Sequence, residues 1–292
     1  LVAISILWGL TWIVSRQGVH YMPALQLAGI RQTFAGIVFL SYFLFKKSEW
    51  PRGKQWLQIF VLSLLNLVLT NGLTTLSVKY ISAGLASIIA AIYPLWLVII
   101  AAFSLRSTVS FKTVLGLILG FAGICLVFYG HLKDFFNPDF QIGILISIAA
   151  SVSWAFGTLY TKKLSSSFNP YFSIAIQMVI AGIFLYAFST FSGQHIPVRT
   201  IPWQSWTAIF FLAIFGSITA FIAFLYAIQH LPVAQVSIYA YINPIVAVLA
   251  GSWFLQEELT YSIALGGIIT LYGVYLVNKT VASRNSKVPS AE

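Results

Sequence analysis

The residues of this sequence that could bind a small molecule lie within strongly apolar stretches. They are Trp8, Trp12, Asn66, Asn71, Tyr93, Trp154, Tyr239, Tyr241 and Asn243. A Trp or Tyr in the middle of an apolar stretch must bury its polar group or pair it in a cavity. Together these side chains could stack on a flat or apolar solute and hydrogen-bond a few of its polar groups. Ordinary packing between helices is the alternative for each residue taken alone.

Arg31 is a charged residue well inside an apolar stretch. An ionised group at that depth usually faces the interior of a membrane protein and has a partner. No Asp or Glu lies at mid-depth in any of the apolar stretches, so we expect backbone carbonyls or an anionic solute to be the partner. The alternative is a side chain that extends to the outer interface, with Arg16 as its neighbour.

Pro94 and Pro244 lie near the middle of two apolar stretches. A proline inside a helix lacks an N–H donor and displaces the carbonyl four residues earlier, which here belongs to Ala90 or Ala240. Matched interruptions of this kind are typical of hinges beside a transport site. A static kink is the alternative interpretation.

Groups that could carry out catalysis are few. Glu257 follows a late apolar stretch, where it could relay protons or cap the helix that begins near Thr260. The histidines lie near the ends of stretches without the spacing of metal ligands, at positions 20, 131, 195 and 230. We therefore expect neither an enzyme, nor a metal site, nor a cofactor.

The composition defines the elements that position these residues. Of the 292 residues, 59% are hydrophobic and only 8% are charged, whereas a soluble domain has about 25% charged residues. So few charges cannot cover a surface that faces water. Because one helical span takes about 20 apolar residues, the chain has room for roughly ten. The sequence therefore predicts an all-α polytopic membrane protein.

Ten apolar segments separated by polar, Pro- or Gly-containing breaks are the predicted transmembrane helices. They cover residues 1–18, 24–45, 55–77, 83–104, 112–130, 141–161, 170–191, 204–229, 233–254 and 260–278. Residues 280–292 are polar, and we expect them to form a disordered tail.

The basic residues predict the orientation of these helices. Eleven lie in alternate breaks or in the tail, namely Lys46, Lys47, Arg52, Lys54, Arg106, Lys112, Lys162, Lys163, Lys279, Arg284 and Lys287. The opposite breaks hold Lys79, Lys133 and Arg199. The positive-inside rule places the eleven, and both termini, in the cytoplasm. The net charge of +10 thus indicates membrane topology and no nucleic-acid partner. We expect the protein to lie in a bacterial inner membrane.

The chain also repeats itself. Trp8 and the run 35–37 recur as Trp154 and 181–183, which are 146 residues later, and Pro94 recurs 150 residues later as Pro244. Five segments form each unit, and because five is odd, the second unit enters the membrane from the opposite side. We therefore expect two inverted five-helix repeats, at 1–136 and 137–279, a plan typical of secondary transporters. Chance similarity between apolar segments is the alternative.

Glycines recur in the fifth and tenth segments, at positions 116, 120 and 123 and at 266, 267 and 273. Small residues at this spacing let helix backbones approach closely. Packing within the chain is the first interpretation, and a homodimer through these two helices is an extension of it.

Short motifs in both halves are similar to those of one family. The first half carries Ile6-Leu7-Trp8-Gly9-Leu10-Thr11-Trp12, Gly29-Ile30-Arg31 and the small residues from Ala86 to Pro94, and the second carries Ile242-Asn243-Pro244 and Phe254-Leu255-Gln256-Glu257-Glu258-Leu259-Thr260. Over essentially its whole length the chain resembles the EamA family of the drug/metabolite transporter superfamily. The family usually has glycine where this chain has Gln256. In the first half, Leu105-Arg106-Ser107 replaces the corresponding Leu-Gly-Glu, and Gln177 stands at the place that corresponds to Arg31.

The resemblance implies a ten-helix transporter with a central cavity that opens alternately to each side of the membrane. Members of the family move amino acids, other metabolites and some toxic compounds, most often outward. We therefore expect a secondary transporter in the lipid bilayer that exports amino acids or related compounds. The alternatives are a receptor or scaffold without transport, a channel, or a carrier of nucleobases, sugars or toxic compounds.

Overall fold

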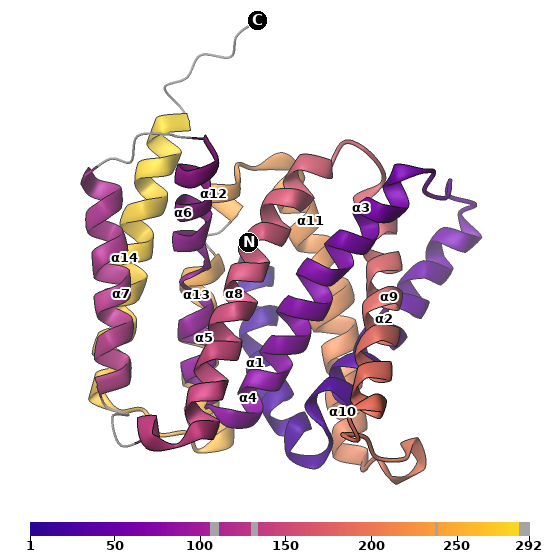
Figure 1. Ribbon diagram of the computed structural model, residues 1–292, viewed down its shortest axis with the longest axis horizontal. Coiled ribbons are helices and arrows are strands. Elements are labelled where there is room, and N and C mark those ends of the chain that lie inside the picture. The colour runs from indigo at the N-terminus through magenta and orange to yellow at the C-terminus, as the bar shows by residue number, and fades with distance from the viewer. Residues whose placement is uncertain (106–110, 130–133, 237–238, 286–292) are drawn as a thin grey trace, which may run out of the picture.

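The computed structural model describes residues 1–105, 111–129, 134–236 and 239–285, and within these ranges every regular element is a helix (Figure 1). This confirms the predicted all-α class. Arg106, His131, Lys133 and Lys287 lie outside the described residues, as does the side chain of Tyr241.

The helices follow one another with short connections. The first half contains α1 (Val2–Tyr21), α2 (Ala24–Phe45), α3 (Lys54–Ser63), η1 (Leu64–Gly72), α4 (Leu73–Tyr80), α5 (Ala83–Ala90), α6 (Tyr93–Leu105), α7 (Phe111–Tyr129) and η2 (Asp134–Phe136). The second half contains α8 (Pro138–Leu164), α9 (Pro170–Phe191), η3 (Val198–Thr200), α10 (Trp203–Phe211), η4 (Leu212–Thr219), α11 (Ala220–His230), α12 (Val233–Val236), α13 (Tyr239–Leu255) and α14 (Tyr261–Asn285). The last helix thus extends six residues into the segment expected to be a tail.

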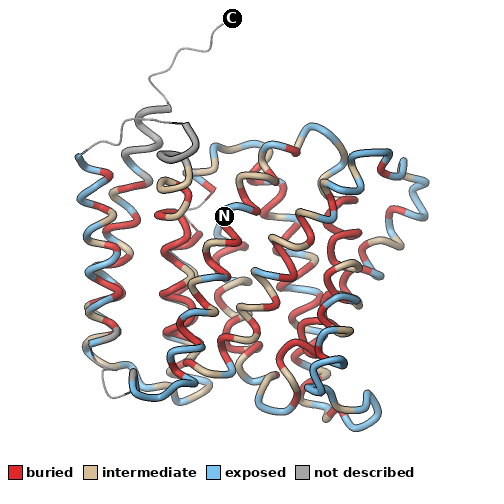
Figure 2. The backbone as a smooth tube through the Cα atoms, in the orientation of Figure 1, coloured by how far each residue is buried: buried red, intermediate tan, exposed pale blue. Residues whose placement is uncertain are grey.

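Seven helical rods among the described residues are long and apolar enough to cross a membrane. They cover 2–21, 24–45, 54–80, 83–100, 138–164, 170–191 and 203–230, and shorter apolar helices cover 111–127, 242–255 and 261–277. Large apolar side chains such as Phe45, Phe111 and Trp253 are mostly exposed, which suits contact with lipid. Buried and exposed residues alternate along the outer helices (Figure 2). The chain is therefore a membrane-spanning helical protein.

Two helix pairs pack closely through glycine. In the pair of α2 and α9, a Cβ added to Gly29 would lie 2.6 Å from the backbone nitrogen of Tyr186, and one added to Gly36 would lie 2.7 Å from that of Val179. Because the contact moves backward along α9 as it moves forward along α2, the two helices are antiparallel. The small residues act as the sequence predicted, by letting backbones touch.

The glycines of α7 and α14 also face each other. A Cβ on Gly116 would lie 2.7 Å from the carbonyl oxygen of Gly273, and one on Gly123 would lie 2.6 Å from that of Gly266. The predicted close packing within the chain is confirmed. A homodimer through α7 and α14 would therefore have to use their other faces.

Two π-helices, η1 and η4, interrupt the rods at 54–80 and 203–230. In each, a threonine hydroxyl donates to the carbonyl five residues earlier, from Thr70 to Leu65 at 2.6 Å and from Thr219 to Ile214 at 2.8 Å. Insertions of this kind are frequent at functional sites. The amino-acid sequence alone does not predict them.

The two prolines differ in their surroundings. Pro244 lies inside α13, as expected. Pro94 does not lie in the interior of a helix: α5 ends at Ala90, and α6 begins at Tyr93, so Pro94 occupies the first turn of α6. A proline there loses no hydrogen bond, because the first N–H groups of a helix have no partner within it. The expectation of two matched interior prolines is therefore wrong for the first half.

Candidate functional site

The helices enclose a central cavity of about 110 Å³, bordered by α1, α2, η1, α4, α5, α6, α8, α11 and α13. Eight of the ten residues predicted to bind substrate line it, namely Trp8, Trp12, Arg31, Asn71, Tyr93, Trp154, Tyr239 and Asn243. Pro244 lines it as well. Asn66 lies in a separate small cavity, described below. Residues far apart in the sequence thus converge on one space, as the sequence predicted for most of them.

An aromatic cluster forms one wall of the central cavity. Trp8 contacts Trp154 and Tyr239 with ring centroids 5.6 and 5.1 Å apart. The Trp154 indole N–H donates to the Tyr239 hydroxyl at 2.6 Å, and the Trp8 indole N–H donates to the Gly216 carbonyl at 3.0 Å. Buried indole groups need such partners. The rings are therefore held at fixed positions by four different helical segments.

Phe221 and Phe224 complete this cluster. Phe224 lies 5.4 Å from Trp8 and 5.1 Å from Trp154 between ring centroids, and Phe221 lies 5.4 Å from Trp8. These two residues were not predicted from the sequence, because a phenylalanine in an apolar helix has no feature that separates a cavity wall from ordinary packing.

Arg31 is the charged side chain that borders the cavity among the described residues, and it is only 3% exposed. Its Nε donates to the Ser217 hydroxyl at 3.0 Å. A Cβ on Gly216 would lie 2.9 Å from Nη2 of Arg31, so the glycine leaves room for the guanidinium. No ion pair within the described ranges joins Arg31 to a carboxylate. The guanidinium can therefore bind an anionic group of a solute.

The alternative that Arg31 extends to the outer interface beside Arg16 is wrong. Arg31 turns inward to Ser217, because a hydroxyl and a polar cavity are within its reach. The Arg16 side chain instead donates to the backbone carbonyls of Val78 and Lys79 at the end of α4.

Trp12 and Asn243 connect the two halves of the chain across the cavity. The indole N–H of Trp12 donates to the side-chain oxygen of Asn243 at 3.2 Å. Hydroxyl groups complete the polar lining, at Thr11, Ser15, Thr70, Thr74, Thr75, Ser87 and Ser151. The sequence offers no signal for these hydroxyls, since Ser and Thr occur throughout membrane helices and often bond to their own backbone.

Glu257 caps a helix, though not the one expected. Its two carboxylate oxygens accept hydrogen bonds from the backbone N–H groups of Ala83 at 2.8 Å and Gly84 at 3.1 Å, in the first turn of α5. The start of α14 is capped by Thr260, whose hydroxyl accepts from the N–H of Ile263 at 3.3 Å. The prediction that Glu257 caps the helix near Thr260 is therefore wrong. Its carboxylate is engaged 174 residues away along the chain.

A wider cavity of about 550 Å³ lies at the end of the bundle where α1 ends. It is lined by Arg16, His20, Lys79 and Glu257, among others. Arg16 directly follows Ser15 of the central cavity. In the described part of the chain, no cluster of His, Cys, Asp or Glu could hold a metal ion.

A bundle of membrane-spanning helices around an aromatic and polar cavity is the class of membrane protein that can bind a small molecule within the bilayer. The profile of the EamA-like transporter family matches residues 1–129 and 141–279. The chain belongs to the EamA-like transporter family. The relatives found by comparison are named as transporters and not as enzymes, so this chain is not expected to be an enzyme.

Several transporters are similar to this chain over half to nearly all of its length. An uncharacterized transporter of Bacillus subtilis (strain 168), YvbV, is 29% identical over 94% of this chain and 88% of its own. An uncharacterized inner membrane transporter of Escherichia coli (strain K12), YedA, is 33% identical over 95% of this chain and 89% of its own. A probable amino-acid metabolite efflux pump of Escherichia coli (strain K12) is 27% identical over 56% of this chain and 52% of its own.

One solved crystal structure has the same fold. Its TM-score is 0.70 at 17% sequence identity, and the match covers 98% of both chains. At this identity the likeness concerns the fold alone.

Proposed function

We propose that the chain is a secondary transporter that moves small metabolites across the inner membrane by alternating access, and that it exports amino acids or related compounds. The observation that carries this proposal is the buried Arg31. Its guanidinium faces a cavity of Trp, Tyr, Asn and hydroxyl side chains, and no carboxylate of the described residues neutralises it. A carboxylate beside an apolar group is the complementary ligand.

The fold we propose for this activity has ten transmembrane helices in two inverted five-helix repeats, at 1–136 and 137–279. Three observations support it. The family profile matches both halves. The corresponding helices α2 and α9, and likewise α7 and α14, pack antiparallel against each other. The π-helices η1 and η4 occupy corresponding rods and share the same threonine hydrogen bond. Units related in this way can exchange conformations and so alternate access.

The direction of access follows from the orientation we propose, in which both termini and the connections richest in Lys and Arg are cytoplasmic. The cavity of about 550 Å³ at the end of α1 then faces the outside. In this orientation the aromatic cluster lies on the cytoplasmic side of the central cavity, because Trp8 precedes Ser15 along α1 and Trp154 follows Ala150 along α8. The structure then represents an outward-facing conformation, and the cluster is the inner barrier to solute.

Amino acids are our choice of substrate class, and two observations support it. Arg31 suits a carboxylate, while Asn71, Asn243 and the hydroxyl groups can bind an ammonium or other polar group. One relative is named as a probable amino-acid metabolite efflux pump. Pro244 would bend α13 during the change of access, and the break before Pro94 would serve α5 and α6 in the same way.

Counterflow in proteoliposomes tests the proposal, with a labelled panel of amino acids, nucleobases and sugars and with or without a pH gradient. We expect accumulation of amino acids that bear a carboxylate, and loss of accumulation with Arg31→Gln. Arg16→Gln is the matched control, because Arg16 binds backbone carbonyls outside the central cavity. Accumulation of another solute class would overturn the substrate assignment. Saturable binding without flux would overturn transport and favour a receptor.

A further inference from the structure

A second, much smaller cavity of about 10 Å³ lies between α3, η1, α8, α9 and α11. Three of the polar side chains that border it are Asn66, Thr161 and Gln177, which are 3%, 8% and 3% exposed. The Asn66 amide N–H₂ group donates to the Thr161 hydroxyl at 3.2 Å and to the Gln177 side-chain oxygen at 3.4 Å. A space of this size holds about one water molecule.

This polar cluster is incompletely paired. The side-chain oxygen of Asn66, which borders the cavity, has no hydrogen-bond partner among the described residues. Buried polar groups are normally satisfied, and an exception needs an explanation. The one water molecule for which the cavity has room can satisfy such a group in this conformation, and a polar group of a solute can take its place when the cavity opens.

The small cavity continues the central cavity on the other side of the aromatic cluster. Phe221 borders both cavities, and Phe224, which borders the small one, packs against Trp8 and Trp154. At its far end the small cavity is lined by Ser165 and Phe168 of the connection between α8 and α9, and by Pro170, the first residue of α9. The aromatic cluster therefore separates two polar spaces that lie along one path.

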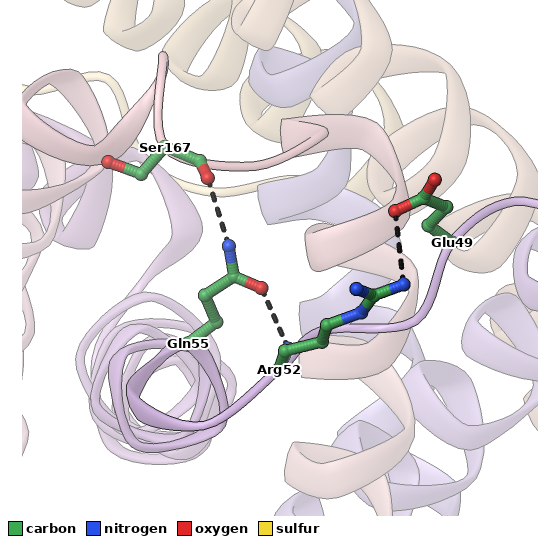
Figure 3. A network of polar contacts seen from close by, with 4 residues as sticks. All are labelled: Glu49, Arg52, Gln55 and Ser167. Carbon is green, nitrogen blue, oxygen red and sulfur yellow. Dashed lines mark hydrogen bonds and ion pairs between the residues drawn. The ribbon is translucent and has the colours of Figure 1, made fainter.

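A hydrogen-bonded contact joins the loops at this far end (Figure 3). The amide N–H₂ of Gln55, in α3, donates to the Ser167 carbonyl at 3.0 Å, and its oxygen accepts from the Arg52 backbone N–H at 2.8 Å. Arg52 also forms an exposed ion pair with Glu49 at 3.6 Å. The connection between α2 and α3 is thereby tied to the connection between α8 and α9.

Gln177 corresponds to Arg31, because the two positions are 146 residues apart and lie in the corresponding helices α9 and α2. Each binds a polar residue of the π-helix from the other half of the chain. Arg31 donates to Ser217 of η4, and Gln177 accepts from Asn66 of η1. One pair borders the central cavity of about 110 Å³ and the other borders the small one of about 10 Å³.

We propose that Asn66, Thr161 and Gln177 form a second binding site, which opens to the cytoplasm when the outer cavity closes and takes a hydrogen-bonding group of the solute there. This inference rests on alternating access as proposed above. The Asn66 oxygen would accept from an ammonium or hydroxyl group, and the Gln177 amide would donate to a carboxylate. Because neither residue is charged, the site is expected to bind a carboxylate more weakly than Arg31 does.

Thiol accessibility tests the site without a known substrate. In a Cys125→Ser background, Thr161→Cys is treated with a membrane-impermeant methanethiosulfonate reagent from either face, and Ser165→Cys is the positive control at the edge of the same cavity. We expect Thr161→Cys to be modified from the cytoplasmic face only, and faster when Gln55→Ala removes the contact with Ser167. Modification from the outer face would overturn the inference. So would no modification from either face while Ser165→Cys reacts.

The residues of the proposed second site are tested by measuring the flux of labelled amino acids separately from each face of the membrane. Gln177→Met is expected to raise the KM on the cytoplasmic face about fivefold and to leave the outer KM nearly unchanged. Gln26→Met is the control, because Gln26 is an equally buried amide that binds the backbone of Ile196 away from both cavities. Equal changes of KM on both faces would overturn the second site. If none of the labelled amino acids were transported, that result would count against the proposed substrate class only. Thiol accessibility would still decide this inference.

Discussion

The carboxylate of Glu257 accepts a hydrogen bond from the backbone N–H of Ala83 at 2.8 Å, and so a residue of the second half holds the first turn of α5 in the first half. The other carboxylate oxygen accepts from Gly84 at 3.1 Å. A negative charge at a helix N-terminus is favourable for both its hydrogen bonds and its interaction with the helix dipole. The geometry favours a capping role for Glu257 over a proton relay.

Replacing Glu257 should therefore change stability more than coupling. We expect Glu257→Ala to lower the free energy of unfolding by about 1–2 kcal/mol, measured as a lower melting temperature in detergent. Glu257→Gln keeps one acceptor oxygen and should lower the melting temperature less than Glu257→Ala does. The neighbouring Glu258→Gln is the control. If Glu257→Gln abolished flux driven by a pH gradient without lowering the melting temperature, a proton relay would be the better explanation.

Gln256 adopts a left-handed backbone conformation, with φ of 57°. This conformation costs an ordinary residue about 1–2 kcal/mol and costs glycine almost nothing. Gln256→Gly is expected to raise the melting temperature, because glycine adopts this conformation without strain. Gln256→Val should lower it, because a β-branched side chain tolerates positive φ least. A lower melting temperature for Gln256→Gly would contradict this backbone argument.

The helices and most of the cavity residues could be predicted from the sequence for a simple physical reason. Apolar length defines a membrane helix, and polar or aromatic groups at its middle depth must turn to the interior, as Arg31 and Trp154 do. Depth along a helix can be read from the sequence, whereas rotation around it cannot when a π-helix changes the register. Asn66 and Asn71 both belong to η1, yet they border different cavities.

Other features could not be predicted because their partners are distant in the sequence. The helix that Glu257 caps begins 174 residues earlier, so local spacing pointed to Thr260 instead. The π-helices η1 and η4 are as apolar as the α-helices that flank them and carry no separate pattern. Phe221 and Phe224 resemble ordinary core residues until the aromatic cluster is seen.

Gly216 should be essential for the position of Arg31. An added Cβ would lie 2.5 Å from Cγ2 of Thr11 and 2.9 Å from Nη2 of Arg31, so one of these side chains must move. We expect Gly216→Ala to raise the outer KM of carboxylate solutes about tenfold, equivalent to about 1.4 kcal/mol. Flux of the same solutes as amides should change much less, since they lack the charge that Arg31 binds. The control is Gly267→Ala, since its added Cβ would meet only Ile88 at 3.6 Å. Gly193→Ala is not a suitable control, because Gly193 has a positive φ. If Gly216→Ala impaired transport of the acids and of the amides to the same extent, a general packing defect would be the better explanation.

The hydrogen bond between Trp154 and Tyr239 should hold the inner barrier closed. It joins α8 to α13 at 2.6 Å, and Tyr239 also stacks on Tyr93 with ring centroids 5.8 Å apart. Tyr239→Phe keeps the ring but leaves the buried indole N–H without its acceptor, which costs about 1–3 kcal/mol. We expect Tyr239→Phe to lower the fraction of molecules in the outward-facing conformation. Thr161→Cys should therefore be modified faster from the cytoplasmic face. Trp154→Phe in the same chain removes the unpaired N–H, so the double variant should be less destabilised than the sum of the single variants. Additive losses in melting temperature, with unchanged modification of Thr161→Cys, would show that the aromatic cluster packs without controlling access.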